Sequence, residues 1–121
     1  MYGLKFTQLL SGFGWLVRNG TVQTDDMTSV APRTAIGTDA KGRLLLFEAD
    51  GVERLVPPLG LTLAQLAQWM QALGTVQAIN LDGGGSSTVV LNGQIYNQPH
   101  CNDTFGVICE RSVTTVACIM P

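Results

Sequence analysis

The segment Asn80-Leu81-Asp82-Gly83-Gly84-Gly85-Ser86-Ser87-Thr88 constrains the fold of this chain more than any other. Three consecutive glycines lose much backbone entropy on folding, so a structure that keeps them must need bare backbone there. The apolar residues 76–81 before them predict a short strand, and residues 88–91 predict a return strand. One interpretation is a tight connection between two strands. The other is a loop that lets a ligand approach its N–H groups, with Asp82 beside an anion site.

Two familiar loop motifs are excluded at this segment. A phosphate-binding P-loop needs a lysine after the last glycine and a helix behind it, whereas Ser86 follows here and the next residues favour a strand. A nucleophile elbow needs a second glycine two residues after the serine, where this chain has Thr88. Ser86 is therefore a poor candidate for an activated nucleophile.

Turn signals divide the rest of the chain into short strands. The Asn-Gly pairs at 19–20 and 92–93 each predict a hairpin. The other predicted strands are residues 33–37, 43–48 and 111–120, the last because it alternates and is rich in Val and Thr.

One amphipathic helix is predicted at about residues 62–73. Thr62 is a good N-cap and Gln65 completes a capping box, while Gly74 is the expected C-terminal stop. Together these elements predict the α+β class: a mixed, largely antiparallel sheet built from hairpins, with one main helix.

Composition excludes several functions. Hydrophobic residues make up 45% of the 121 residues and charged residues 13%, which predicts a folded core and a surface partly covered by more protein. The net charge is -2 and no run of Lys or Arg occurs, so we expect no nucleic-acid partner. The longest uncharged stretch, residues 55–81, contains four Gln and two Pro and is a poor membrane span.

Arg33 stands at the start of an apolar strand. Such an arginine is most often a solvated edge residue, and its functional alternative is a bidentate phosphate clamp. His100, the only histidine, is expected to be a loop residue rather than a ligand.

The cysteines and two sequons favour an oxidising, glycosylating compartment. Cys101, Cys109 and Cys118 lie within the last 21 residues and lack metal-type spacing. Their odd number leaves either a free buried thiol or a cysteine whose partner lies upstream. Asn19 and Asn102 begin the two N-glycosylation sequons.

Short sequence motifs along the whole chain resemble, in the same order, those of the phosphodiester glycosidase family. These motifs are Gly14-Trp15-Leu16-Val17-Arg18-Asn19-Gly20, Arg33-Thr34-Ala35-Ile36-Gly37, Gly42-Arg43-Leu44-Leu45-Leu46-Phe47, Gly60-Leu61-Thr62-Leu63, Ala78-Ile79 with the glycine segment, and the tail from His100-Cys101 through Cys109 to Arg111 and Cys118. One glycine-rich loop would be a weak signal, whereas the ordered set is specific.

The resemblance implies a hydrolase that cleaves N-acetylglucosamine from a GlcNAc-1-phospho-mannose diester. Its partners would be the phosphorylated high-mannose glycans of lysosomal enzymes, on which cleavage exposes mannose 6-phosphate. The expected location is the secretory pathway, at the Golgi or trans-Golgi network, or else secreted or in a cell envelope. We expect no cofactor and no metal.

Site roles follow from the chemistry of such a diester. A phosphate monoester departs without strong protonation, so a dedicated general acid is less necessary than in ordinary glycosidases. We predict Arg33 and Asp82 as catalytic residues, Arg33 on the phosphate and Asp82 on the sugar side as general base, nucleophile or hydroxyl holder. The predicted substrate-binding residues are Asn80, Gly83, Gly84, Gly85, Ser86 and Ser87.

The family domain extends further upstream than this chain. We therefore expect residues 1–121 to be the C-terminal portion of one phosphodiester glycosidase domain, completed by a missing N-terminal half and anchored to a membrane only through missing C-terminal sequence. Two alternatives stay open: a non-catalytic secreted binding module on the same scaffold, and a bacterial-type cell-envelope phosphodiester glycosidase.

Overall fold

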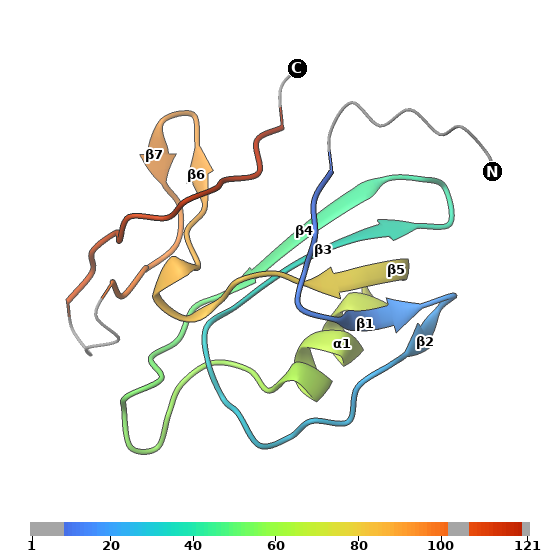
Figure 1. Ribbon diagram of the computed structural model, residues 1–121, viewed down its shortest axis with the longest axis horizontal. Coiled ribbons are helices and arrows are strands. Elements are labelled where there is room, and N and C mark those ends of the chain that lie inside the picture. The colour runs from blue at the N-terminus through green and yellow to red at the C-terminus, as the bar shows by residue number, and fades with distance from the viewer. Residues whose placement is uncertain (1–8, 102–106, 120–121) are drawn as a thin grey trace.

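The computed structural model describes residues 9–101 and 107–119, and its centre is a five-stranded sheet (Figure 1). The sheet has the order β2-β1-β5-β3-β4, and all neighbouring strands in it are antiparallel. The strands are β1 (Trp15–Arg18), β2 (Thr21–Val22), β3 (Arg33–Asp39), β4 (Leu44–Ala49) and β5 (Thr75–Asn80). A separate pair consists of β6 (Val90–Leu91) and β7 (Gln94–Ile95).

Both predicted Asn-Gly hairpins are confirmed. Asn19 and Gly20 have φ values of 50° and 75° between β1 and β2, and Asn92 and Gly93 have 52° and 77° between β6 and β7. Positive φ at both central residues is the requirement of the two-residue turn that matches strand twist, and Asn and Gly adopt it most readily.

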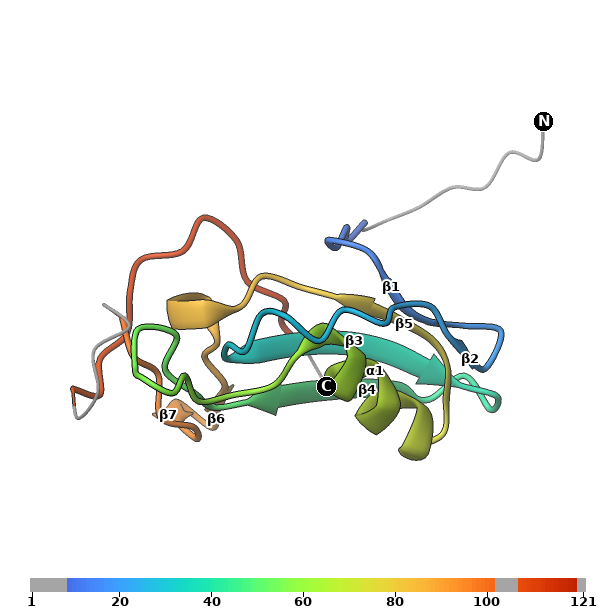
Figure 2. The same ribbon diagram turned by 90° about the horizontal axis from the view of Figure 1, so that it is seen from below.

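The helix α1 (Leu63–Ala72) begins where the capping box predicted. The Thr62 hydroxyl accepts from the Gln65 N–H at 3.2 Å, and the Gln65 side chain accepts from the Thr62 N–H at 2.9 Å. α1 packs on one face of the sheet (Figure 2), and the core contains Leu16, Val17, Ala35, Leu66, Ala67, Met70 and Ala78. The predicted α+β class is confirmed.

The opposite face of the sheet is apolar and open. It carries Trp15, Ile36, Leu44 and Ile79, and no described segment covers Leu44, which stays 50% exposed. A surface of this kind is what the low charge content predicted. The described part of the chain has no helix long and apolar enough to cross a membrane.

Asn97 fastens the β6–β7 pair to the end of β4. Its amide N–H group donates to Asp50 at 3.0 Å and to the Ser87 carbonyl at 2.9 Å, and its amide oxygen accepts from the Val89 N–H at 2.8 Å. Glu48 lies in the same region, half-buried, and burial raises its pKa to about 7, with a further increase from the negative charge of Asp50.

This raised pKa predicts that the protein loses stability between pH 5 and pH 8. The folded state favours protonated Glu48, so its contribution is complete below the ordinary value of 4.5 and is lost as the pH rises through about 7. Because Glu48 is only partly buried, solvent screening reduces the free energy of unfolding that this pKa shift contributes to roughly 1–2 kcal/mol. Thermal melting of Glu48→Gln should show a flatter pH dependence and a higher melting temperature at pH 8 than the parent protein. The control is Glu110→Gln at an exposed site, and an unchanged slope in Glu48→Gln would contradict the assignment.

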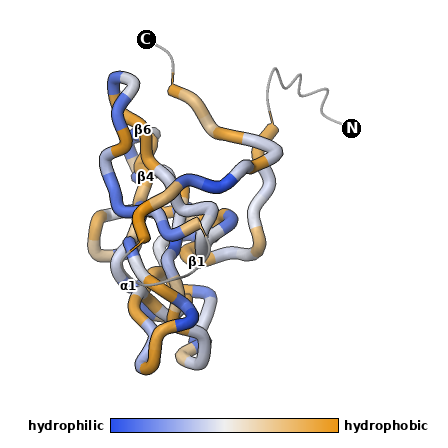
Figure 3. The backbone as a smooth tube through the Cα atoms, turned by 90° about the vertical axis from the view of Figure 1, so that its left-hand side faces the viewer, coloured by the Kyte–Doolittle hydropathy of each residue, from blue (hydrophilic) through white to orange (hydrophobic). Residues whose placement is uncertain are grey.

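The C-terminal segment does not form the predicted strand. Residues 111–119, the described part of the predicted 111–120, contain no strand. Figure 3 shows this segment as hydrophilic where it begins and increasingly hydrophobic towards the C-terminus. The prediction was wrong because alternation is a local property, whereas a strand needs a partner with free backbone groups. Arg111 in this segment contacts the glycine loop instead.

A disulfide joins Cys101 to Cys109 and leaves Cys118 as an exposed free thiol. We predict that peptide mapping of the non-reduced whole protein recovers the Cys101–Cys109 pair, and that Cys118 pairs with a cysteine outside residues 1–121. Recovery of all three cysteines as free thiols would contradict both halves of this prediction.

Candidate active site

The antiparallel sheet brings the predicted site residues together at one end of its strands. Because β3 and β5 run in opposite directions, the start of β3 lies beside the end of β5, with Ala35 opposite Asn80. Arg33 at the start of β3 and Asp82 just after β5 therefore lie at the same end of the sheet. The end of β4 also lies there, since Ala49 pairs with Arg33.

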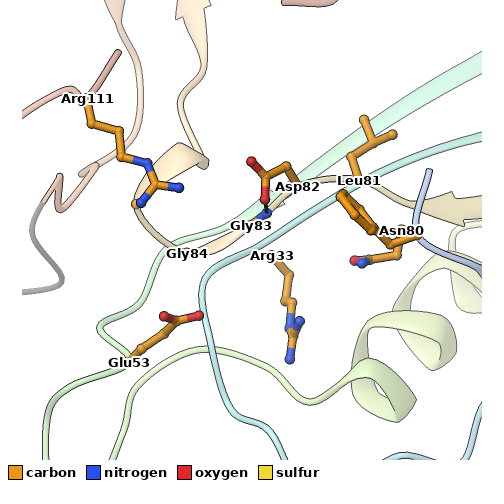
Figure 4. Close-up of a pocket in the computed structure, with 10 residues that line it drawn as sticks. Arg33, Glu53, Asn80, Leu81, Asp82, Gly83, Gly84 and Arg111 are labelled. Atoms are coloured by element: carbon orange, nitrogen blue, oxygen red, sulfur yellow. Dashed lines mark hydrogen bonds between the residues drawn. The ribbon is translucent and has the colours of Figure 1, made fainter. Parts of the chain in front are cut away.

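A cavity of about 320 Å³ opens at this end of the sheet. It is lined by residues 80–85 and by Phe13, Arg33, Glu53 and Arg111 (Figure 4). Two guanidinium groups and two carboxylates thus surround one space. This combination can bind an anion and move a proton or attack a carbon in the same site.

Arg33 is anchored to the protein on one side. Its Nε donates to the Leu61 carbonyl at 3.1 Å and its Nη2 donates to the Ser29 carbonyl at 2.6 Å. In Figure 4 its guanidinium points away from Asp82. These two bonds use two of the five N–H donors, so three remain for a ligand.

The backbone of the glycine loop is largely engaged within the protein. The Gly83 N–H donates to the Asp82 carboxylate at 3.0 Å, the Gly84 N–H to the Pro32 carbonyl at 3.0 Å, and the Ser86 N–H to the Gly83 carbonyl at 3.1 Å. In the described part of the chain only the Gly85 N–H of this group has no acceptor. The expected row of backbone donors for an anion is thus reduced to one.

Packing against the protein explains why these positions are glycines. A Cβ on Gly83 would stand 2.7 Å from the Pro32 carbonyl oxygen, and one on Gly85 would stand 2.9 Å from the His100 carbonyl oxygen. Gly84 has a φ of 58°, which favours glycine, and a Cβ there would stand 3.2 Å from the Glu53 carboxylate. Neighbouring chain segments, rather than a ligand, already require bare backbone here.

Asn80 is the buried polar residue of the cavity. It is 9% exposed, and its Oδ1 has no hydrogen-bond donor in the described part of the chain. Figure 4 shows its amide turned towards the space between Arg33 and Asp82. Leaving a buried acceptor unpaired costs about 1–3 kcal/mol, so its retention points to a donor on a ligand.

The two serines of the loop have different surroundings. Ser87 is 2% exposed and its hydroxyl accepts from the Thr34 hydroxyl at 3.2 Å, so it supports the loop from inside and does not line the cavity. The Ser86 hydroxyl accepts from Arg111 through Nε at 3.1 Å and Nη2 at 2.6 Å. Substrate contact by either serine stays a prediction.

Sequence reasoning missed Glu53 and Arg111 as site residues. Glu53 lies in an irregular loop, where no periodicity marks it, and Arg111 was assigned only to the incorrect final strand. Arg111 also belongs to the tail that resembles the phosphodiester glycosidase family, and this was the one available signal. Phe13, 77% exposed, and Leu81 also line the cavity without a predicted role.

The remaining predicted sites lie away from the cavity. Asn19 is exposed at the β1–β2 turn, where its Oδ1 accepts from Gln77 at 2.8 Å. Asn102 lies outside the described residues. No group of three or more metal-ligating side chains that could hold an ion occurs within residues 9–101 and 107–119.

Comparison with known proteins decides the family. The model of the phosphodiester glycosidase family matches residues 3–120. The chain belongs to the phosphodiester glycosidase family.

Relatives within the phosphodiester glycosidase family share most of this chain. The human N-acetylglucosamine-1-phosphodiester alpha-N-acetylglucosaminidase is 40% identical across an alignment of 134 positions, which covers 94% of this chain and 25% of the relative. The catalytic domain of the zebrafish enzyme of that name, solved in a form auto-inhibited by its pro-peptide, matches with a TM-score of 0.73 and 34% identity over 86% of this chain and 39% of that chain. An uncharacterised prophage-derived protein of Bacillus subtilis (strain 168) is 34% identical over 69% of this chain and 14% of its own length. The chain thus spans about a quarter of the length of the human relative.

Proposed function

We propose that this protein is a hydrolase that removes N-acetylglucosamine from a GlcNAc-1-phospho-mannose diester. The product would be mannose 6-phosphate on the phosphorylated high-mannose glycans of lysosomal enzymes. The names of the human and zebrafish relatives support the sugar and the type of bond. Of the whole site, residues 1–121 would supply the part described above, together with sequence from the rest of the domain.

The observation that carries the proposal is the pairing of cations and carboxylates around one cavity. Arg33 and Arg111 offer positive charge for a phosphate, while Asp82 and Glu53 offer two carboxylates for the sugar carbon. A plain glycosidase needs the carboxylates alone, whereas a sugar phosphodiester requires both kinds of group.

Cleavage of the diester requires different groups at its phosphate and at its sugar. The bond that breaks joins the anomeric carbon of the sugar to a phosphate oxygen, and the phosphate departs with the electron pair. Arginine stabilises the charge that grows on this leaving group. Asp82 takes a proton from the water that attacks the anomeric carbon, or attacks that carbon itself, in which case water then hydrolyses the glycosyl ester and frees Asp82. Glu53 is the second carboxylate of the site.

Asn80 suits the sugar end of the substrate. Its buried Oδ1 needs a donor, and an N-acetylated sugar offers both hydroxyl groups and an amide N–H. The exposed ring of Phe13 at the mouth of the cavity offers an apolar surface for a sugar face. These two contacts provide a reason for the site to select the N-acetylated sugar.

The proposed place of action is the secretory pathway, at the Golgi. The disulfide between Cys101 and Cys109 supports an oxidising compartment, because such bonds persist where thiols are not kept reduced. Subcellular fractionation of cells that express the whole protein tests this placement, and recovery in the cytosol would contradict it.

The activity is tested by comparing two substrates with the whole protein. One is the methyl glycoside of GlcNAc-1-phospho-mannose, and the other is an uncharged aryl N-acetylglucosaminide with a leaving group of similar acidity. We expect the diester to have at least about a tenfold higher kcat/KM, because the guanidinium groups contact only its phosphate.

Each other result has a definite meaning. Equal kcat/KM for the two substrates would show that the phosphate is not recognised. Absence of turnover by a folded protein that still binds the diester would favour the non-catalytic binding module.

A further inference from the structure

Arg111 carries a positive charge that no carboxylate in the described part of the chain neutralises. The only ion pair among the described residues joins Arg43 to Asp39. The partner of Arg111 is a single neutral group, the Ser86 hydroxyl, which accepts from both Nε and Nη2. Arg111 is exposed and lines the cavity together with two carboxylates, and its N–H donors are directed at the Ser86 hydroxyl rather than at either of them. A guanidinium placed in this way is a candidate anion site.

The other groups of the cavity leave room for this role. Among the described residues the glycine loop leaves one N–H without an acceptor, that of Gly85, and Arg33 uses two donors on the Leu61 and Ser29 carbonyls. In Figure 4 the Arg111 guanidinium points towards the Asp82 carboxylate, whereas that of Arg33 points away from it. An anion next to Asp82 would therefore meet Arg111.

The disulfide fixes the segment that carries Arg111. The Cys101 N–H donates to the Cys109 carbonyl at 3.0 Å, and the Cys109 N–H donates to the Pro99 carbonyl at 2.9 Å. Gly85 in turn packs against the backbone of residues 100–101 and against the Arg111 side chain. The disulfide region, the glycine loop and Arg111 thus form one connected unit.

The contact with Ser86 also prepares a second donor. A hydroxyl has one hydrogen and two lone pairs. The Ser86 hydroxyl oxygen accepts from two N–H groups of Arg111, so its own hydrogen remains available to donate to another acceptor. Arg111 and Ser86 together offer donors suited to the non-bridging oxygens of a phosphate.

We propose that Arg111 and Ser86 form a phosphate-binding contact, separate from Arg33, that recognises the phosphate group of a sugar phosphodiester and of the monoester product. This inference rests on the proposed function for its substrate. Its structural basis is independent of turnover: Arg111 lines the cavity, forms no ion pair with the described residues, and donates to Ser86, which adjoins the lining residue Gly85. Arg111 binds the phosphate and positions Ser86, while the bond-breaking step belongs to the carboxylates.

The test measures binding and turnover in the same variants. We expect Arg111→Gln in the whole protein to raise KM for the diester, and the inhibition constant of inorganic phosphate, by about fivefold, with kcat changed much less. Ser86→Ala should raise both by a smaller factor, since it removes one donor and releases the other. The control is Arg54→Gln, which removes the same charge from an exposed residue that does not line the cavity.

A second readout separates this inference from the proposed function. Phosphate binding to the same proteins, followed by the ³¹P linewidth of inorganic phosphate, requires no catalysis. If the parent protein cleaves the diester while Arg111→Gln keeps the parental KM and phosphate affinity, the Arg111 contact is wrong and the function stands. If no diester is cleaved but phosphate binding weakens only in Arg111→Gln and Ser86→Ala, the function is wrong and the anion contact stands.

Discussion

Asp82→Asn should lower kcat for the sugar phosphodiester by roughly a hundredfold or more, the usual scale for a positioned acid–base group. The substitution keeps the size of the side chain and removes its charge, so a carboxylate that attacks carbon or accepts a proton loses its chemistry. The fold should survive, because Asp82 is exposed and, among the described residues, its carboxylate accepts only the Gly83 N–H, which an asparagine oxygen can also accept. Steady-state kinetics on the GlcNAc-1-phospho-mannose diester measures the effect.

Thermal melting and a matched substitution complete this experiment. Asp25→Asn makes the same chemical change at an exposed residue outside the cavity and should leave kcat unchanged. If folded Asp82→Asn turns over the diester at the parental rate, Asp82 is not catalytic. Glu53 would then be the remaining carboxylate of the cavity, and the glycine loop would be a tight connection that follows β5.

Arg33→Lys should lower kcat/KM for the same diester by about tenfold or more, equivalent to roughly 1.4 kcal/mol of transition-state binding. The guanidinium spans the Leu61 and Ser29 carbonyls and still has donors for a phosphate. The point charge of lysine cannot reproduce this planar arrangement. The melting temperature should also fall, because two carbonyls lose a charged donor.

Kinetics below the melting transition separate the two effects of Arg33. Arg18→Lys, at an exposed position on β1, is the control and should keep parental kcat/KM. Equal losses in Arg33→Lys and Arg33→Ala agree with a two-point clamp. Parental kcat/KM in both variants would show that Arg33 only ties the segment before β3 to the loop before α1.

Local signals in the sequence predicted most of the fold. The Asn-Gly turns and the Thr62–Gln65 capping box depend on residues a few positions apart, so they were visible without knowledge of tertiary contacts. The strand predicted at 111–120 failed because strand formation depends on a partner elsewhere in the chain. Local alternation gives no information about that partner.

The site was only partly predictable for the same reason. Arg33 and Asp82 stood at strand ends in the sequence, and the antiparallel order of β3 and β5 places both at one cavity. Glu53 and Arg111 arrive from irregular segments, where position depends on long-range contacts such as the Cys101–Cys109 disulfide. The three glycines stand out in the sequence, and the Pro32 and His100 carbonyls account for two of them without a ligand.

The glycosidase assignment is tested most directly by which bond of the diester is hydrolysed. A diester of GlcNAc-1-phosphate and mannose can be cleaved at the sugar carbon or at phosphorus, and hydrolysis in ¹⁸O-labelled water distinguishes the two. Attack at the sugar carbon, as we propose for the carboxylates beside Asn80, puts the label in free N-acetylglucosamine and leaves mannose 6-phosphate unlabelled. Mass spectrometry that finds the label in the phosphate product would contradict the glycosidase assignment.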